Sequence, residues 1–407
     1  MRVTTAHSYD TTIAQLNKRQ AELVEKQERI STGKRVIRAS DDPVAAALAE
    51  TVQNRLSRVQ TDQRSIDASR TSMQQAESAL GEAGELIQKV RDLMVAGGNG
   101  TYGDGEREAL AAQIEGLREQ LFSFANRKDS AGRSLFGGLG GSSTPFVQEF
   151  GPGGGQVRFD GQRGQQSATD VSLPQALDGH QILMRVPQAN GTFRLDQGAA
   201  NTGSLRSDIG QVTDLSSLTG HDYRIDFAEV AGEMQYSVTD LTTASPVAGH
   251  TAVPYSTGMQ VEFDGMSFLL SGSPGTGDTL DIVPADTPTD LFKVMQDAVD
   301  ALRTPTNASG DAARRTQDLG RALTELDAGH DRVLLARAQA GDWLNRADTI
   351  ENLLKNREVD HTAEQSALED LDLVKGISEF QSQQIGLDAA LKSYAQVQRL
   401  SLFQYVS

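Results

Sequence analysis

The sequence predicts an α+β protein: an elongated, antiparallel helical rod built from both chain ends, with a β-rich domain inserted in the middle. Two observations support this class. Apolar residues at helical spacing occupy both ends of the 407-residue chain, whereas short alternating segments with turn signals occupy its centre.

The first amphipathic segment runs from about residue 8 to 31. Its apolar residues and two glutamines alternate at steps of three and four, which is the spacing of a heptad seam. We therefore expect a coiled-coil helix that needs a partner, because an isolated helix of this kind is marginal in water. The apolar seam residues are Ile13, Leu16, Leu23 and Ile30.

A corner follows within the segment STGKRVIRASDDPVAAALA (Ser31 to Ala49). Gly33 is placed to end the first helix in a left-handed conformation. Asp41 or Asp42 is placed to cap the next helix, and Pro43 suits its first position. The segment therefore predicts a rigid joint between two helices.

Further helices are predicted on both sides of the centre. One runs from residue 43 to about 96, and a second follows the turn at residues 97–106. After the centre, helical spacing restarts near residue 291. A long helical stretch is then expected from about Asp311 to the C-terminus.

The C-terminal end repeats the seam pattern of the N-terminal end. Steps of four and three separate its apolar residues, with one glutamine among them. We expect this segment to be the second terminal coiled-coil helix. Its seam residues are Leu373, Ile377, Phe380, Leu387, Leu391 and Tyr394.

The centre, from about residue 146 to 285, is rich in Gly, Ser, Thr and Asp. Short alternating runs predict antiparallel strands, and Asn190-Gly191 and Asp264-Gly265 are hairpin signals. Its density of surface loops suggests an outward-facing module.

Composition excludes several classes of function. The net charge of −17 argues against nucleic acid and anionic membranes as partners. No apolar run reaches the length of a membrane span. The chain has no cysteine, which fits an exported protein or chance equally well. The six histidines are scattered, and no phosphate loop or catalytic triad is recognisable. We predict no catalytic, cofactor-binding or metal-ligating residues.

What remains is an interaction protein that assembles. Many copies packed around an axis can bury the apolar ends that one copy cannot. Three segments of the sequence then resemble bacterial flagellin and its relatives. They are RISTGKRVIRASDDPVAAALA (29–49), KVRDLMVAGGNGTYGDGEREALAAQIEGLREQL (89–121) and SALEDLD (366–372).

Details within the family favour a junction protein over filament flagellin. Pro43 and Val44 follow the Asp pair where filament flagellins usually have alanines. The segment GRSLFGG (132–138) and the ending YAQVQRLSLFQYVS are similar to those of the outer hook–filament junction protein. The alternatives are a filament flagellin subunit, a secreted enzyme with a site in the β domain, and a cytoplasmic scaffold.

The resemblance implies three layers. Residues 1–42 with 373–407 would form an inner tube, 43–145 with 286–372 a helical rod, and 146–285 an outward β domain. The corner from Gly33 to Pro43 would be the elbow between the first two layers.

The resemblance also implies a location and partners. The chain would leave the cell through the flagellar type III apparatus and form a ring at the hook–filament junction. Its partners would be further copies of itself, hook-associated protein 1, flagellin, and an export chaperone on the C-terminal helix.

Overall fold

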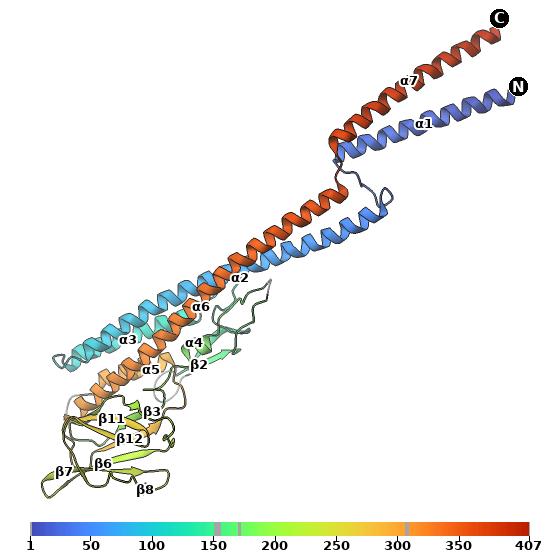
Figure 1. The fold of residues 1–407 in the computed structure, drawn as a ribbon. Coiled ribbons are helices and arrows are strands. Elements are labelled where there is room, and N and C mark those ends of the chain that lie inside the picture. Colours follow the sequence, from blue (N-terminus) through green and yellow to red (C-terminus); the bar gives the residue numbers. More distant parts are fainter. Residues whose placement is uncertain (1, 150–155, 170–171, 306–308, 407) are drawn as a thin grey trace. The chain divides into compact units, whose positions relative to one another are not determined.

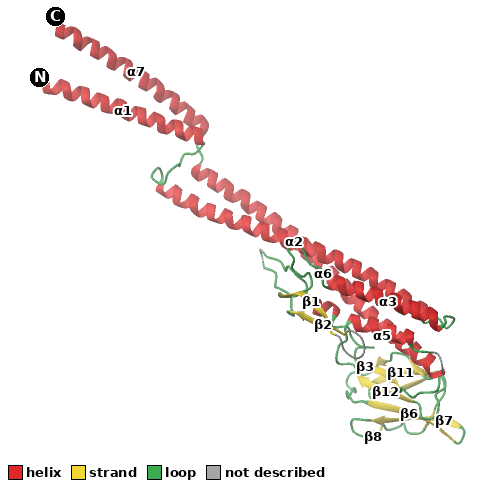
Figure 2. Ribbon diagram, turned by 180° about the vertical axis from the view of Figure 1, so that it is seen from behind, coloured by secondary structure: helices red, strands yellow, loops and turns green. Residues whose placement is uncertain are grey.

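Figure 1 shows the computed structural model of the chain, which describes residues 2–149, 156–169, 172–305 and 309–406. Helices form both ends and strands are confined to the central region (Figure 2), which confirms the predicted α+β class. Contacts divide the chain into two compact units. Residues 1–65 with 349–407 form the first unit, and residues 66–348 form the second.

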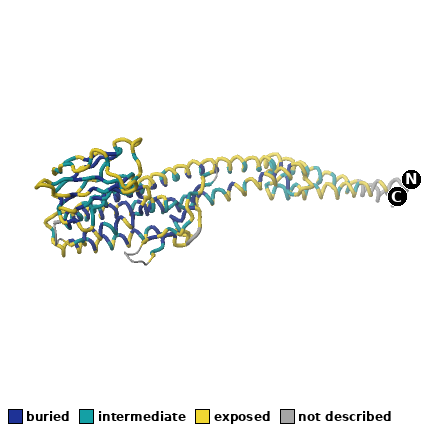
Figure 3. The backbone as a smooth tube through the Cα atoms, turned by 90° about the horizontal axis from the view of Figure 1, so that it is seen from below, coloured by how far each residue is buried: buried dark blue, intermediate teal, exposed yellow. Residues whose placement is uncertain are grey.

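The first unit contains α1 (Arg2–Thr32), α7 (Leu373–Val406) and parts of α2 (Pro43–Gly97) and α6 (Ser309–Glu369). α1 and α7 lie side by side (Figure 1). Few of their residues are buried (Figure 3). The buried apolar residues of this unit lie instead in the joint, α2 and α6: Val36, Ala45, Ala49, Val52, Val59, Ile350 and Leu354.

The helical stretch predicted from about Asp311 to the C-terminus consists of two helices. α6 ends at Glu369 and α7 begins at Leu373. The break is stabilised because Asp372 caps the new helix: its Oδ1 accepts a hydrogen bond from the backbone N–H of Lys375 at 3.1 Å. No glycine or proline marks this break in the sequence.

The second unit has a helical core. α3 (Asp104–Ala125) begins where Glu106 accepts a hydrogen bond from the N–H of Gly103, at 2.8 Å. α5 (Leu291–Arg303) begins where Asp290 accepts one from the N–H of Lys293, also at 2.8 Å. Together with α2 and α6 these helices share one core, which includes Met73, Ile87, Met94, Ile114, Leu121, Phe292, Met295, Leu326 and Val333.

A β-hairpin and a short helix complete this helical core. β1 (Gly141–Glu149) pairs antiparallel with β2 (Gln156–Gly161). Phe146 of β1 is buried against Phe292, with 5.9 Å between the ring centroids. α4 (Gly179–Leu183) adds two further apolar side chains to the same core.

The remaining strands form a separate β module with two antiparallel sheets. One has the order β3 (Phe193–Gln197), β12 (Thr279–Pro284), β6 (Tyr223–Val230), β7 (Glu233–Asp240), β8 (Ser245–Pro246), with β9 (Val253–Pro254) also beside β7. The other has β10 (Met259–Phe263), β11 (Met266–Ser271) and β4 (Arg206–Ser207), with β5 (Gln211–Val212) also beside β11. The module has its own core, including Phe193, Leu195, Tyr223, Ile225, Phe227, Phe268, Leu270, Leu280 and Ile282.

One of the two hairpin predictions is confirmed. Asp264-Gly265 connects β10 to β11, in which Phe263 pairs with Met266. The other is wrong, because the strand after Asn190-Gly191 pairs with the last strand of the module: Phe193 lies opposite Pro284. Asn190 makes a turn, but its amide binds the carbonyls of Ile209 and Gly210.

Candidate functional site

The connection between α1 and α2 begins with a left-handed residue. Gly33 has a φ of +69°, a conformation that costs little without a Cβ. Its carbonyl accepts a hydrogen bond from the backbone N–H of Leu371, at 2.8 Å. The predicted helix stop therefore turns the chain toward the connection between α6 and α7.

Backbone hydrogen bonds pair these two connections. The N–H groups of Arg35 and Val36 both donate to the carbonyl of Glu369, at 2.6 and 3.3 Å. Lys34 and Asp370 form an antiparallel bridge, and the Nζ of Lys34 lies 2.7 Å from Oε2 of Glu369. The two connections thus form one structure, called the joint below (residues 33–42 and 369–372).

The Arg35 side chain links both parts of the joint. Its Nη1 donates to Oδ2 of Asp42 at 3.0 Å, and its Nη2 donates to the carbonyl of Leu368 at 2.8 Å. The other carboxylate oxygen of Asp42 accepts from the N–H of Ala45, also at 3.0 Å. This N–H, and then the Arg35 guanidinium, lower the pKa of Asp42.

Asp41 has a different role from Asp42. Its Oδ2 accepts hydrogen bonds from the N–H groups of Arg38 and Ile37, at 3.0 and 3.1 Å, and these two bonds lower its pKa. Asp41 therefore shapes the connection, whereas Asp42 caps α2. Pro43 is the first residue of α2, where its missing N–H costs no hydrogen bond.

Sequence reasoning missed the second half of the joint. The segment SALEDLD (366–372) resembles a family motif, but nothing in the sequence says that it pairs with residues 33–36. Within the motif, the N–H of Asp370 donates to the carbonyl of Ser366, at 2.9 Å. The pairing joins residues more than 330 positions apart, so no local signal could reveal it.

The structure places all ten predicted seam residues on α1 and α7, and none is fully buried. Ile13, Ile377 and Leu391 are exposed, at 43%, 44% and 47%, as is Leu373. The other six are half-buried: Leu16, Leu23, Ile30, Phe380, Leu387 and Tyr394. Other apolar side chains of these helices are more exposed still, with Val374 at 82% and Ile385 at 70%.

Few polar contacts connect α1 to α7 in the described residues. The Nζ of Lys26 lies 2.5 Å from Oε2 of Glu379, and Arg19 donates to the carbonyl of Gly386 at 3.5 Å. Two charged side chains at an exposed site contribute little. The helix pair therefore keeps an incompletely buried apolar surface next to the joint.

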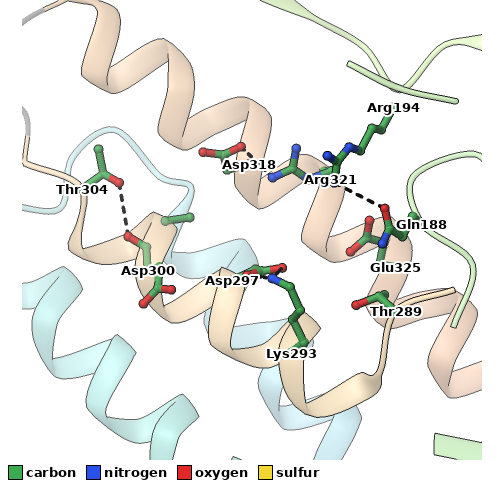
Figure 4. A pocket seen from close by; sticks show the side chains of 11 residues that line it. Gln188, Arg194, Thr289, Lys293, Asp297, Asp300, Thr304, Asp318, Arg321 and Glu325 are labelled. Atoms are coloured by element: carbon green, nitrogen blue, oxygen red, sulfur yellow. Dashed lines mark hydrogen bonds and ion pairs between the residues drawn. The ribbon is translucent and has the colours of Figure 1, made fainter. Parts of the chain in front are cut away.

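The second unit contains a polar pocket of about 240 Å³ between α5, α6 and the residues before β3 (Figure 4). Its charged side chains are largely paired with each other: Lys293 lies 2.7 Å from Asp297, and Arg321 lies 3.0 Å from Asp318. Glu325 accepts a hydrogen bond from the N–H of Ala189 at 2.8 Å, although burial raises the pKa of Glu325. The two ion pairs lie within α5 and within α6, whereas the Glu325 hydrogen bond connects α6 to the residues before β3.

The described histidines are also separate from one another. His221 pairs with Asp240 at 2.7 Å, His330 contacts Gln88, and His250 contacts Tyr236. In the described ranges, no group of three or more His, Cys, Asp or Glu residues is arranged to hold a metal ion. Within the same residues, none of the helices combines the length and apolar character of a membrane span.

Comparison with known proteins shows a similarity to flagellar proteins. A profile of the bacterial flagellin N-terminal helical region matches residues 3–140. Flagellar hook-associated protein 3 of Escherichia coli (strain K12) is 27% identical over 409 aligned positions, which cover 99% of each chain. The chain is thus similar to flagellar hook-associated protein 3 along its whole length and to bacterial flagellins in its N-terminal region.

Other flagellar proteins match over a smaller share of the chain. A solved structure of the flagellar junction protein FlgL from Legionella pneumophila has a TM-score of 0.68 at 25% identity, and the match covers 74% of this chain and 99% of that one. Polar flagellin F of Vibrio parahaemolyticus is 31% identical over 122 residues, covering 30% of this chain and 32% of that one.

These similarities support a broad role for the chain. It is a structural component of the bacterial flagellum, and it is not an enzyme. It is therefore part of the flagellum and associates with other flagellar axial proteins.

Proposed function

We propose that the chain is the outer adapter of the hook–filament junction, assembled as a ring before the filament grows. The single observation that carries this proposal is the similarity to hook-associated protein 3 along 99% of both chains. Flagellin matches cover about a third of the chain or less. A filament subunit is therefore the second candidate, favoured only by the shared N-terminal region.

The proposed assembly uses the α1–α7 pair as the inner layer. Its seam residues are exposed or half-buried in one copy, and burying such side chains between copies is favourable by about 25 cal/mol per Å². The joint would then connect this inner layer to the helical rod of residues 43–145 and 286–372, with residues 146–285 facing outward.

The joint suits a connection of this kind. The connection between α1 and α2 and the connection between α6 and α7 are hydrogen-bonded to each other through Gly33, Arg35 and Glu369. Two connections that are hydrogen-bonded to each other resist bending and twisting more than two independent linkers do. Torque passed between layers would therefore be carried by a hydrogen-bonded element.

Export and partners belong to the same proposal. The chain would pass through the flagellar type III apparatus and contact hook-associated protein 1 on one side and flagellin on the other. The exposed apolar residues of α7, including Val374 and Ile385, are the surface that an export chaperone would cover before assembly.

Immunogold labelling of isolated flagella tests the position directly. An antibody against the β module should label one band between hook and filament. Labelling along the whole filament would instead support the flagellin alternative. Absence of the protein from isolated flagella would contradict both.

A further inference from the structure

The sequence contains two Asn-Gly pairs, Asn99-Gly100 and Asn190-Gly191. An asparagine followed by glycine is open to a spontaneous reaction in water. The backbone nitrogen of the glycine attacks the side-chain carbonyl carbon, because no side chain of the following residue hinders the approach. The two pairs lie in very different surroundings, and this difference predicts their reactivity.

Asn99 and Gly100 are exposed in the turn between α2 and α3. The Oδ1 of Asn99 accepts a hydrogen bond from the N–H of Thr101 at 3.2 Å, which folds the side chain over the intervening peptide. Across the described residues, neither the Asn99 Nδ2 nor the Gly100 N–H has a hydrogen-bond partner. Both the leaving group and the attacking nitrogen are therefore free to move.

Every polar atom of the Asn190 side chain makes hydrogen bonds. Its Nδ2 donates to the carbonyls of Ile209 and Gly210, at 3.3 and 3.2 Å. Its Oδ1 accepts from the N–H groups of Thr192 and Phe193, at 3.0 and 2.9 Å.

The glycine after Asn190 is held as well. The N–H of Gly191 donates to the carbonyl of Gln188 at 2.7 Å, and the φ of Gly191 is +82°. Attack on Asn190 therefore requires several hydrogen bonds to break together, in a half-buried site.

We infer that Asn99 is a site of spontaneous deamidation in the folded protein, and that the β module protects Asn190 from the same reaction. A bond forms between the Gly100 nitrogen and Cγ of Asn99, and the bond from Cγ to Nδ2 breaks. Ammonia leaves and a succinimide remains. Water then opens the ring at either carbonyl, giving aspartate or isoaspartate at position 99.

The product changes the turn in two ways. Each conversion adds a negative charge close to the C-terminal end of α2, where the helix dipole is unfavourable for an anion. Isoaspartate also routes the backbone through the side-chain carboxyl, which lengthens the turn. The hydrogen bond from the Tyr102 N–H to the Asn99 carbonyl, at 3.3 Å, then loses its geometry.

The experiment follows both sites in one sample of the full-length protein. The protein is incubated at mildly alkaline pH and body temperature for several weeks, and each peptide is quantified by mass spectrometry as the conversion of amide to acid. We expect the Asn99 peptide to convert at least about tenfold faster than the Asn190 peptide, because several hydrogen bonds protect the latter. Equal rates in the folded protein would overturn the inference.

Two controls separate structure from sequence. In concentrated urea both sites should convert at similar rates; if Asn190 stays slow there, the fold is not what protects it. Gly100→Ala should slow conversion of Asn99 in the folded protein without disturbing the turn, since a Cβ at this position meets no atom within 4 Å. An unchanged rate in this variant would also contradict the inference.

Discussion

The backbone N–H of Arg35 donates a hydrogen bond to the carbonyl of Glu369 at 2.6 Å. This contact connects the segment that follows α1 to the segment that precedes α7. The segment between α1 and α2 and the segment between α6 and α7 thereby form a single joint.

Arg35→Ala should loosen the joint without unfolding the chain. The side chain is 43% exposed, so we expect a loss of about 1 kcal/mol for its two hydrogen bonds together. Amide exchange at Val36 and Leu371 should then accelerate about fivefold. Arg55→Ala, which removes an exposed arginine of α2, is the matched control and should leave both rates unchanged. Unchanged exchange in Arg35→Ala would show that its side chain does not stabilise the joint.

A charged substitution in the predicted seam should impair assembly of the ring but not folding of the single chain. Leu391→Asp replaces an apolar side chain with a charged one. Leu391 is 47% exposed in one copy and would be buried in the proposed ring, where an unpaired charge is costly. The variant should be exported and should not be incorporated. Ser393→Asp adds the same charge at an exposed position of α7 outside the seam and should assemble normally. Incorporation of Leu391→Asp at the normal level would remove this residue from the interface.

Truncation of a buried side chain in the core of the second unit should cause a large loss of stability. Phe292 is fully buried and lies edge-on to Phe122, with 6.1 Å between ring centroids. Phe292→Ala should lower the free energy of unfolding by about 3–5 kcal/mol. Urea denaturation followed by the fluorescence of Trp343 measures this. Leu334→Ala, at a side chain 44% exposed, should change the stability by less than about 0.5 kcal/mol.

The β module should be removable. Among the described residues, its core contains no residue of the helical core, and the helical core contains none from residues 193–284. The first and last strands are neighbours, since Phe193 pairs with Pro284, so a short linker can replace the module. The shortened chain should keep the cooperative unfolding of its helices by circular dichroism. Loss of that cooperativity would show that the helical core depends on the module.

The lowered pKa of His180 should make the stability of the fold depend on pH. Burial, and then the positive charge of Arg163, hold the pKa of His180 below its usual value, while Asp178 opposes them. The unfolded chain therefore binds a proton more readily than the folded chain. This contribution to stability is present above the unfolded pKa of about 6.5 and is lost as the pH falls below it.

The test of that dependence is a difference between variants, because burial raises the pKa of Asp290, Asp318 and Glu325 and gives each an opposite trend. His180→Gln should lose less stability than the wild type on acidification through about pH 6.5. His7→Gln, at an exposed position of α1, is the control. Identical pH profiles for the wild type and His180→Gln would contradict the assignment.

Local signals in the sequence were sufficient for the helices and for one corner of the joint. The seam spacing placed α1 and α7, and Gly33, Asp42 and Pro43 occupy the positions that their conformational preferences predict. These properties depend on neighbours a few residues away. The choice between Asp41 and Asp42 as the cap needed the structure, because both carboxylates accept backbone hydrogen bonds.

Long-range pairing could not be predicted in this way. The Leu371 N–H, between α6 and α7, donates to the carbonyl of Gly33, which is remote in sequence. The turn at Asn190 leads into a strand whose partner is the last of the module. The assembly role of the seam and the three-layer organisation remain predictions, since they concern contacts between copies.

Deletion of the gene, with flagella and culture medium examined together, tests the central claim most directly. The proposed junction role predicts hooks without filaments and soluble flagellin released into the medium. Disappearance of flagellin from both cells and medium would identify the chain as the filament subunit. Intact, motile filaments in the deletion strain would contradict the account.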